Sequence, residues 1–319
     1  MTQAAKKIFS YAVKAVVLVL AFYFIYTKVS SNDNLRRFRT LIEHINNTQV
    51  AVVLSFVFLL MIVNWVLEAL KWRFLTRSLT TISVYQAVES VFCGLTWAVF
   101  TPNRLGEYGG RVMFLPPRRR IHGVFAMAVG SIGQMVLTNV LGITALLWFG
   151  YTFLHLQLWL LLAAISLGML VVVLLLVFYF NISAVVNLLD RIKPLKKYHR
   201  FFGIMSRYRS KELNRIMLFC MARFAVFTFQ YYLVMHLLIP GLNAFFIVMM
   251  VLILFFIQSI LPSLDLIDVG VRSITATTFF AYVTNQQIAV IAGVSSIWFI
   301  NLIVPAILGS VFVFKMKFF

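Results

Sequence analysis

Three charged residues, Arg104, Glu107 and Arg111, lie inside an apolar stretch near the middle of the chain. In a lipid bilayer a charged side chain costs about 2.5–3.5 kcal/mol at the centre of a helix, so such groups pair with one another or face a polar cavity. Pro102 and Gly106 in the same stretch predict a broken helix. We therefore expect a functional site here, with a buried structural ion pair as the alternative.

A second segment late in the chain repeats this arrangement after another apolar run. Asp268 precedes Arg272 by four residues, which is the spacing of the acid and the base in the first segment, so the pair shares one helix face. Asp265 adds a carboxylate, and Pro262 and Gly270 predict the second break. Two broken helices at corresponding places in two halves of a chain are typical of a transporter site.

Other charges lie within or beside apolar runs. Glu89 has no partner nearby in the sequence, so we expect it to pair with another segment or to be protonated, and it is a candidate proton-coupled switch. Glu68 and Lys71 are three residues apart near a helix end and are expected to extend to the membrane interface. Arg223 is a further charge within an apolar run.

The composition indicates a membrane-embedded chain rather than a soluble one. Of 319 residues, 62% are hydrophobic and 12% are charged, against about 45–50% and 25% in soluble domains. The net charge of +19 lies mostly in short loops beside apolar runs, which indicates contact with anionic lipid headgroups and not with nucleic acid. The histidines and cysteines show no metal-ligand spacing and no catalytic motif is found, so we expect no enzyme activity, no metal and no cofactor.

The apolar runs predict an all-α polytopic membrane protein with about eight transmembrane helices and two broken or re-entrant segments. We expect one transmembrane domain over 1–319, built from two pseudo-repeated halves at about 1–156 and 157–319. The runs lie at 8–29, 50–70, 84–100, 124–149, 158–180, 216–238, 244–261 and 288–314.

The basic residues of the loops predict the orientation. Loops 150–157 and 239–243 contain no Lys or Arg and are expected outside, whereas 181–215 is strongly basic and is expected inside, as surface helices or as a solvated loop. Basic residues on both sides of the 84–100 run also favour the inside, and a re-entrant segment would allow this. The arginines at 36–39 would then face outside, which fits this topology badly.

Around the first charged segment, the chain resembles the transmembrane region of lysylphosphatidylglycerol synthases, a family of flippase-like membrane domains. Members commonly show Pro-x-Arg-x-Gly-Glu followed by an arginine and a leucine. These places are filled here by Pro102, Arg104, Gly106, Glu107, Arg111 and Leu115.

The chain departs from this family in two places. The second motif is normally Pro-Gly-Gly-x-Gly followed by a Glu. Leu261-Pro262 with Gly270 resembles it, but the segment from Pro262 to Arg272 lacks the Gly-Gly pair. Many members also carry Glu-Arg and a later Asp in the region where this chain has Gln134 and Asn139. Gln134 is a candidate site residue, with hydrogen bonding between helices as the alternative. No aminoacyl-transferring domain is expected, so the resemblance implies lipid translocation or its support without lysine transfer.

We expect the protein to move an anionic or amphiphilic lipid between the leaflets of a bacterial inner membrane. Guanidinium groups bind phosphate bidentately, so arginines are the expected headgroup ligands and nearby carboxylates their counter-ions. The expected ligands are Arg104, Arg111 and Arg272. The expected counter-ions are Glu107, Asp265 and Asp268.

Two alternatives stay open. An intramembrane transferase acting on polyprenyl phosphates would hold a magnesium diphosphate through Asp265 and Asp268 and would depend on the metal. A non-transporting scaffold would tolerate neutralisation of Arg104 and Glu107. The expected partners are membrane lipids with an anionic headgroup or a polyprenyl phosphate, and a separate lipid-modifying enzyme is a further candidate.

Overall fold

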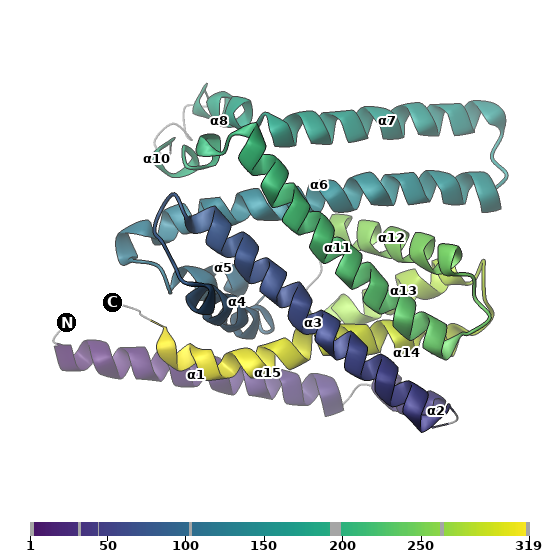
Figure 1. Cartoon of the computed structure of the whole chain (residues 1–319), viewed down its shortest axis with the longest axis horizontal. Coiled ribbons are helices and arrows are strands. Elements are labelled where there is room, and N and C mark those ends of the chain that lie inside the picture. The colour runs from purple at the N-terminus through teal and green to yellow at the C-terminus, as the bar shows by residue number, and fades with distance from the viewer. Residues whose placement is uncertain are drawn as a thin grey trace.

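The computed structural model describes residues 3–30, 33–43, 45–101, 104–191, 199–261 and 265–316. Throughout these residues the regular structure is helical, and the connections are short (Figure 1). The all-α fold class predicted from the sequence is therefore confirmed.

Within the described residues, five helices are long and apolar enough to cross a membrane. No residue in the most apolar window of α7 is buried, as expected of a helix that faces lipid. The chain thus has the pattern of a multi-pass membrane protein. The five helices are α3 (Asn47–Thr76), Pro117–Phe153 with α6 (Arg120–Phe153), α7 (Leu158–Phe180), α11 (Ser210–Leu238) and the C-terminal helix Gln287–Lys315.

The other apolar runs also form helices, namely α1 (Gln3–Ser30), α4 (Val84–Ala98) and α12 (Ala244–Ile260). α4 has 15 residues and α12 has 17, whereas a full crossing takes about 20. Each of these two is followed by a break and a further helix, α5 (Leu105–Val112) and α13 (Asp265–Phe280). All eight expected runs are thus helical, and five of them have the length and hydropathy of a full crossing.

α4 and α5 form a tight hairpin because glycines face each other across it. A Cβ added to Gly110 would lie 2.6 Å from the Cα of Gly94, and one added to Gly106 would overlap the carbonyl oxygen of Trp97. At the turn, Thr101 Oγ1 donates to the Trp97 carbonyl at 2.9 Å and accepts from the Gly106 amide at 2.8 Å. The break expected around Pro102 therefore lies between α4 and α5, although Pro102 itself is outside the described residues.

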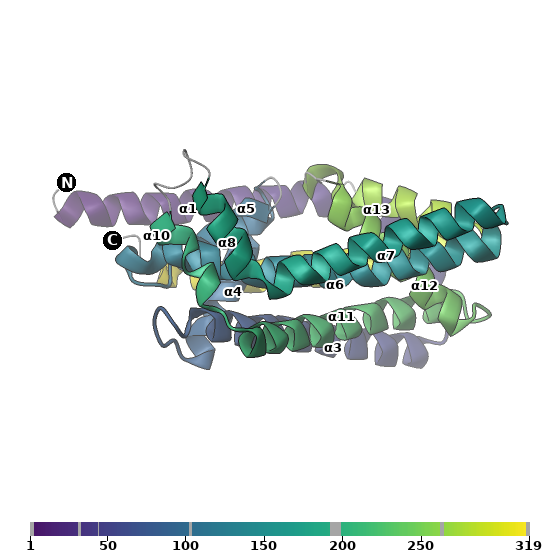
Figure 2. The same ribbon diagram turned by 90° about the horizontal axis from the view of Figure 1, so that it is seen from above.

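The helices are arranged in layers. Viewed from above, α3 and α11 lie along one side of the molecule, α1 and α13 lie along the opposite side, and α6 lies between them (Figure 2). Small residues allow close packing, as membrane helices require. Gly309 of α15 (Val304–Ser310) packs against the backbone of Phe92 in α4. Thr96 of α4 donates to the Ala306 carbonyl at 2.8 Å.

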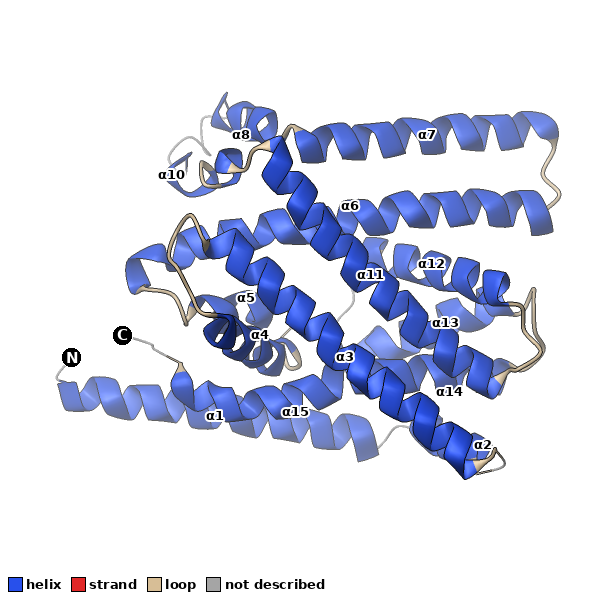
Figure 3. Ribbon diagram, viewed as in Figure 1, coloured by secondary structure: helices blue, strands red, loops and turns tan. Residues whose placement is uncertain are grey.

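The connecting loops lie at two opposite ends (Figure 3). Loops 154–157 and 239–243, which contain no Lys or Arg, are at one end. The connections 77–83 and 113–119 are at the other end, together with α8 (Ile182–Arg191) and α10 (His199–Phe202). The hairpin thus begins and ends on the same side, as the re-entrant hypothesis requires.

The C-terminal helix is interrupted beside the first broken segment. α14 (Gln287–Trp298) is followed by a π-helical segment (Phe299–Ile303) and then by α15. Pro305 has no amide hydrogen to donate to the carbonyl of Asn301, which favours this irregularity. π-Helical segments of this kind occur frequently at functional sites.

Candidate functional site

A cavity of about 500 Å³ lies where the two broken segments meet the layer of α3 and α11. The α4–α5 hairpin contributes Arg104, which caps the start of α5, and Glu107 and Tyr108 of α5, and α13 contributes Arg272. The remaining described lining residues come from α3, α6, α11, α12, α14 and the π-helical segment. The two segments that the sequence marks as breaks therefore border one central space.

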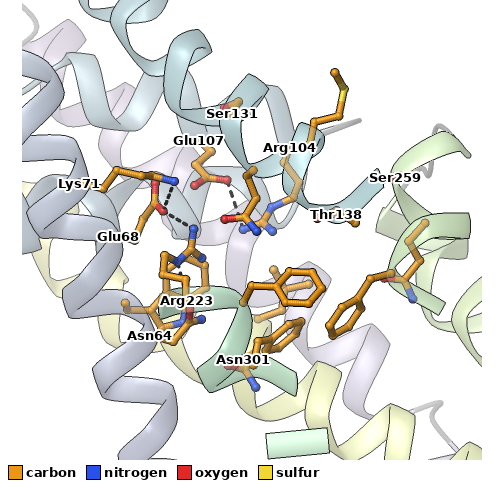
Figure 4. Close-up of a pocket in the computed structure, with 18 of the residues that line it drawn as sticks. Asn64, Glu68, Lys71, Arg104, Glu107, Ser131, Thr138, Arg223, Ser259 and Asn301 are labelled. Carbon is orange, nitrogen blue, oxygen red and sulfur yellow. Dashed lines mark hydrogen bonds and ion pairs between the residues drawn. The ribbon is translucent and has the colours of Figure 1, made fainter. Parts of the chain in front are cut away.

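Glu68 of α3 is the centre of the charged wall (Figure 4). Its Oε2 lies 2.8 Å from Lys71 Nζ, and the same carboxylate binds the guanidinium of Arg223 in α11. Arg223 Nε also donates to Asn64 Oδ1 at 3.1 Å, and its guanidinium lies over the ring of Trp65. This carboxylate therefore joins α3 to α11.

Arg111 connects this cluster to the hairpin. Its Nη1 donates to Glu68 Oε1 at 2.6 Å, and its Nη2 binds Glu107 one helical turn earlier. The expected Glu107–Arg111 pair is therefore present. Arg111 is 1% exposed and is not among the described residues that line the cavity, so it lies behind the wall.

Arg104 faces the cavity from the turn of the hairpin. Its Nη2 is 3.2 Å from Glu107 Oε2, and 38% of its side chain is exposed. Its backbone is left-handed, with a φ of 56°. An L-residue other than glycine costs about 1–2 kcal/mol in this conformation, and such outliers cluster at functional sites. Within the described part of the chain, its Nε has no hydrogen-bond partner.

The cationic groups of the wall outnumber the acidic ones. Among the described lining residues, Lys71, Arg104, Arg223 and Arg272 are cationic, and Glu68 and Glu107 are carboxylates. Four cations against two acids give a formal charge of +2. Cationic groups therefore predominate among the described lining residues, which favours an anionic ligand.

Another part of the wall is aromatic. It includes Phe224 and Phe227 of α11, whose rings both pack against the ring of Phe255 in α12, at centroid distances of 5.4 and 5.2 Å. Trp298 of α14 also lines the space. A cavity with a cationic part and an aromatic part suits an amphiphile, since each part matches one end of such a molecule.

The second broken segment is described in part. Arg272 lines the cavity, as expected. Gly270 lies inside α13, with no atom within 4 Å of an added Cβ, and the helix continues through it. Pro262 lies outside the described residues, as do the side chains of Asp265 and Asp268, so the expected Asp268–Arg272 pair stays a prediction.

Glu89 is placed away from this wall. It is 5% exposed and binds Lys315 near the end of the C-terminal helix. Lys315 Nζ also lies 3.2 Å from Tyr85 Oη. Glu89 therefore finds its partner in another segment, which is one of the two expected outcomes, but it is not among the described residues that line the cavity.

Gln134 lines the cavity from α6, and within the described residues its buried Oε1 accepts no hydrogen bond. A hydrogen bond between helices, which was the alternative role for Gln134, is formed instead by Gln230. Its Nε2 donates to the Val57 carbonyl at 2.9 Å. Gln134 thus stays a candidate site residue.

The expectation that Glu68 and Lys71 extend to the interface was wrong. They are 5% and 3% exposed and form the charged wall. The apolar run ends at about residue 70, but the helix continues to Thr76, so both residues lie inside the span rather than at its end. The sequence shows Arg223 only as a charge within an apolar run and does not indicate its partners. Its partners lie more than 150 residues away in the sequence, where no local spacing indicates them.

Comparison of the chain with models of protein families, with curated proteins and with solved structures finds no match. The resemblance to the lysylphosphatidylglycerol synthase transmembrane region therefore stays a prediction based on the residues of one motif.

Proposed function

We propose that this protein moves an anionic, amphipathic lipid between the leaflets of a bacterial inner membrane. The observation that carries the proposal is the central cavity, where two broken segments contribute Arg104 and Arg272 to a wall whose described cationic residues outnumber its described acidic ones. A charged headgroup cannot cross the hydrocarbon layer unassisted, because that layer offers no polar partners. The cavity offers such partners.

Arg104 and Glu107 have different roles in binding a headgroup. Arg104 is partly exposed to the cavity, and its guanidinium has the geometry to bind a phosphate bidentately. Glu107 holds Arg104 when no lipid is bound. A phosphate that displaces Glu107 from Arg104 leaves this carboxylate paired with Arg111, so the acid is not left without a cation.

The apolar chains of the lipid need no enclosed path. The aromatic wall accepts the region next to the headgroup, while the chains stay in the surrounding bilayer. A cavity of about 500 Å³ has the size of a small-molecule site and matches a headgroup better than a whole diacyl lipid.

Lipid movement in liposomes tests the proposal. The purified protein is reconstituted with lipids that carry a fluorescent acyl chain, and a membrane-impermeant quencher reports how fast each headgroup changes leaflet. Arg104→Gln and Arg272→Gln should each slow the movement of an anionic lipid at least tenfold. Arg39→Gln is the matched control, because Arg39 is 82% exposed and pairs only locally with Glu43 among the described residues.

Two results would contradict the proposal. Wild-type protein that leaves every headgroup in its original leaflet would exclude transport under these conditions. Equal rates for wild type and both cavity variants would show that the cationic wall does not handle the lipid, which is the result that a scaffold would give.

A further inference from the structure

The cavity contains hydrogen-bond acceptors that no described part of the protein satisfies. We propose that its lipid headgroup carries hydroxyl groups beside the phosphate, as a phosphate linked to glycerol or to another polyol does. This inference rests on the proposed function, because it takes the cavity as the place where a headgroup binds.

Asn301 provides the clearest acceptor. Its Nδ2 donates to the carbonyl of Ile297 at 3.1 Å, so the orientation of the amide is set and its oxygen is the free atom. Asn301 is 6% exposed, lines the cavity, and has no partner for Oδ1 within the described chain. Figure 4 shows it on a different side of the cavity from Glu107.

Two further amides, on other helices, also have a buried polar atom without a hydrogen-bond partner among the described residues. Within the described residues, Oε1 of Gln134 in α6 and Nε2 of Gln258 in α12 are buried and have no hydrogen-bond partner, and both residues line the cavity. An amide carries one oxygen and one nitrogen, so either assignment of the ends leaves an unsatisfied polar atom. Three elements thus present unused amide groups to one space.

The chemistry of these atoms separates classes of headgroup. A phosphate diester offers oxygen acceptors alone, so it suits the cationic wall but cannot donate to an amide oxygen. A hydroxyl both donates and accepts, so it satisfies either end of an amide. A buried polar group left without a partner costs about 1–3 kcal/mol, and a headgroup with hydroxyls relieves that cost on binding.

An ammonium group would also donate, but the charge of the cavity opposes it. The described wall carries more cations than acids, and like charges repel strongly in a weakly solvated space. A neutral polyol provides donors without adding positive charge. The inference therefore favours phosphoglycerol or a phosphosugar over ethanolamine, choline or an aminoacylated glycerol.

The test measures binding and movement on the same purified full chain. Dihexanoyl phosphatidylglycerol and dihexanoyl phosphatidylinositol are compared in detergent with dihexanoyl phosphatidylmethanol, a phosphate diester without a hydroxyl group, and with phosphatidylethanolamine of the same chain length. We expect the two polyol lipids to bind about tenfold more tightly than phosphatidylmethanol, because satisfying one or two buried amides has about that effect. Phosphatidylethanolamine should bind most weakly.

Substitutions of the cavity amides test whether these groups determine the lipid selectivity. Gln134→Leu and the double change Gln134→Leu with Gln258→Leu should bring the ratio of the phosphatidylglycerol and phosphatidylmethanol affinities toward one. Asn139→Leu should leave the ratio unchanged. Asn139 is on the same helix as Gln134, but its amide donates to its own helix at Met135, 2.8 Å away, and it is not among the described cavity residues.

The outcomes separate this inference from the proposed function. Equal binding of the polyol lipids and phosphatidylmethanol, or an unchanged ratio in folded Gln134→Leu, would overturn the inference even if lipids move. Selective binding that disappears in Gln134→Leu, with no movement of any lipid in liposomes, would support the inference as a headgroup site and contradict transport.

Discussion

Arg111 Nη1 and Glu68 Oε1 are 2.6 Å apart although the two residues are separated by 43 positions in the sequence. Arg111 is 1% exposed and Glu68 is 5% exposed. The pair joins the α4–α5 hairpin to α3 from behind the cavity wall. Arg111, expected from the sequence to bind a headgroup, is thus placed where it can hold the hairpin that presents Arg104.

Removing the charge of Glu68 should destabilise the protein strongly. Glu68→Gln leaves Lys71, Arg111 and Arg223 without their shared carboxylate. Loss of one partner from a buried ion pair typically costs about 3–5 kcal/mol. Thermal unfolding in detergent should show a large fall in melting temperature.

An exposed pair provides the control for this prediction. Glu43→Gln removes the partner of Arg39, and these side chains are 57% and 82% exposed. Exposed pairs contribute about 0–1 kcal/mol, so the melting temperature should barely change. Equal melting temperatures for Glu68→Gln and Glu43→Gln would show that the buried network does not stabilise the fold.

Relief of the strained backbone at Arg104 should separate stability from function. Arg104→Gly removes the cost of a left-handed residue, about 1–2 kcal/mol, and also removes the guanidinium. The loss of a partly exposed ion pair with Glu107 offsets little of this gain. We expect an unchanged or higher melting temperature together with at least a tenfold loss of lipid movement.

His155 is the matched control. Among the described residues other than glycine, Arg104 and His155 have a positive φ, which is 43° at His155. It lies in the exposed loop 154–157, at the end opposite the start of the hairpin. His155→Gly should raise stability to a similar extent and leave lipid movement at the wild-type rate. Lipid movement at the wild-type rate in Arg104→Gly would show that neither the strained backbone nor the guanidinium of Arg104 is needed to bind a ligand.

The sequence predicted the parts of the fold that depend on local properties. Long apolar runs become helices in a bilayer because every backbone group must be satisfied within the segment. The Glu107–Arg111 pair follows from spacing along one helix, and the break before Arg104 follows from turn residues. These predictions concern residues that are close in the sequence.

The parts that the sequence did not predict are contacts between distant segments. Arg223 reaches Glu68 across 155 positions, and Lys315 reaches Glu89 across 226. A charge in an apolar run indicates that some partner exists, but the packing of the helices decides which one. The prediction for Glu68 and Lys71 was wrong for a related reason. The apolar run ends at about residue 70, whereas the helix continues to Thr76, so both residues lie inside the helix.

Labelling of single cysteines should report the orientation. Cysteines placed in loops 154–157 and 239–243 are expected to react with a membrane-impermeant thiol reagent from outside the cell, and those in 77–83 and 113–119 only after permeabilisation. Cys93 and Cys220 are 0% exposed, so the native thiols should stay silent. Labelling of all four loops from one side would contradict the topology.

Two adjacent glycines test whether the hairpin must close tightly. A Cβ at position 110 would lie 2.6 Å from the Cα of Gly94, where backbone meets backbone and no side chain can move away. Gly110→Ala should therefore separate α4 from α5, at a cost of about 1–3 kcal/mol typical of overpacking. It should also slow lipid movement, because Arg104 and Glu107 are held by this hairpin.

Gly109→Ala adds the same methyl group one residue earlier, where its nearest neighbour is Trp97 Cε3 at 3.9 Å, an ordinary contact distance. Alanine is favoured over glycine inside a helix by about 1 kcal/mol, so this variant should be as stable as the wild type or more stable, with normal lipid movement. Melting temperatures and liposome rates of the two variants give a direct comparison. Equal behaviour of Gly109→Ala and Gly110→Ala would contradict the close approach of α4 and α5 at Gly94.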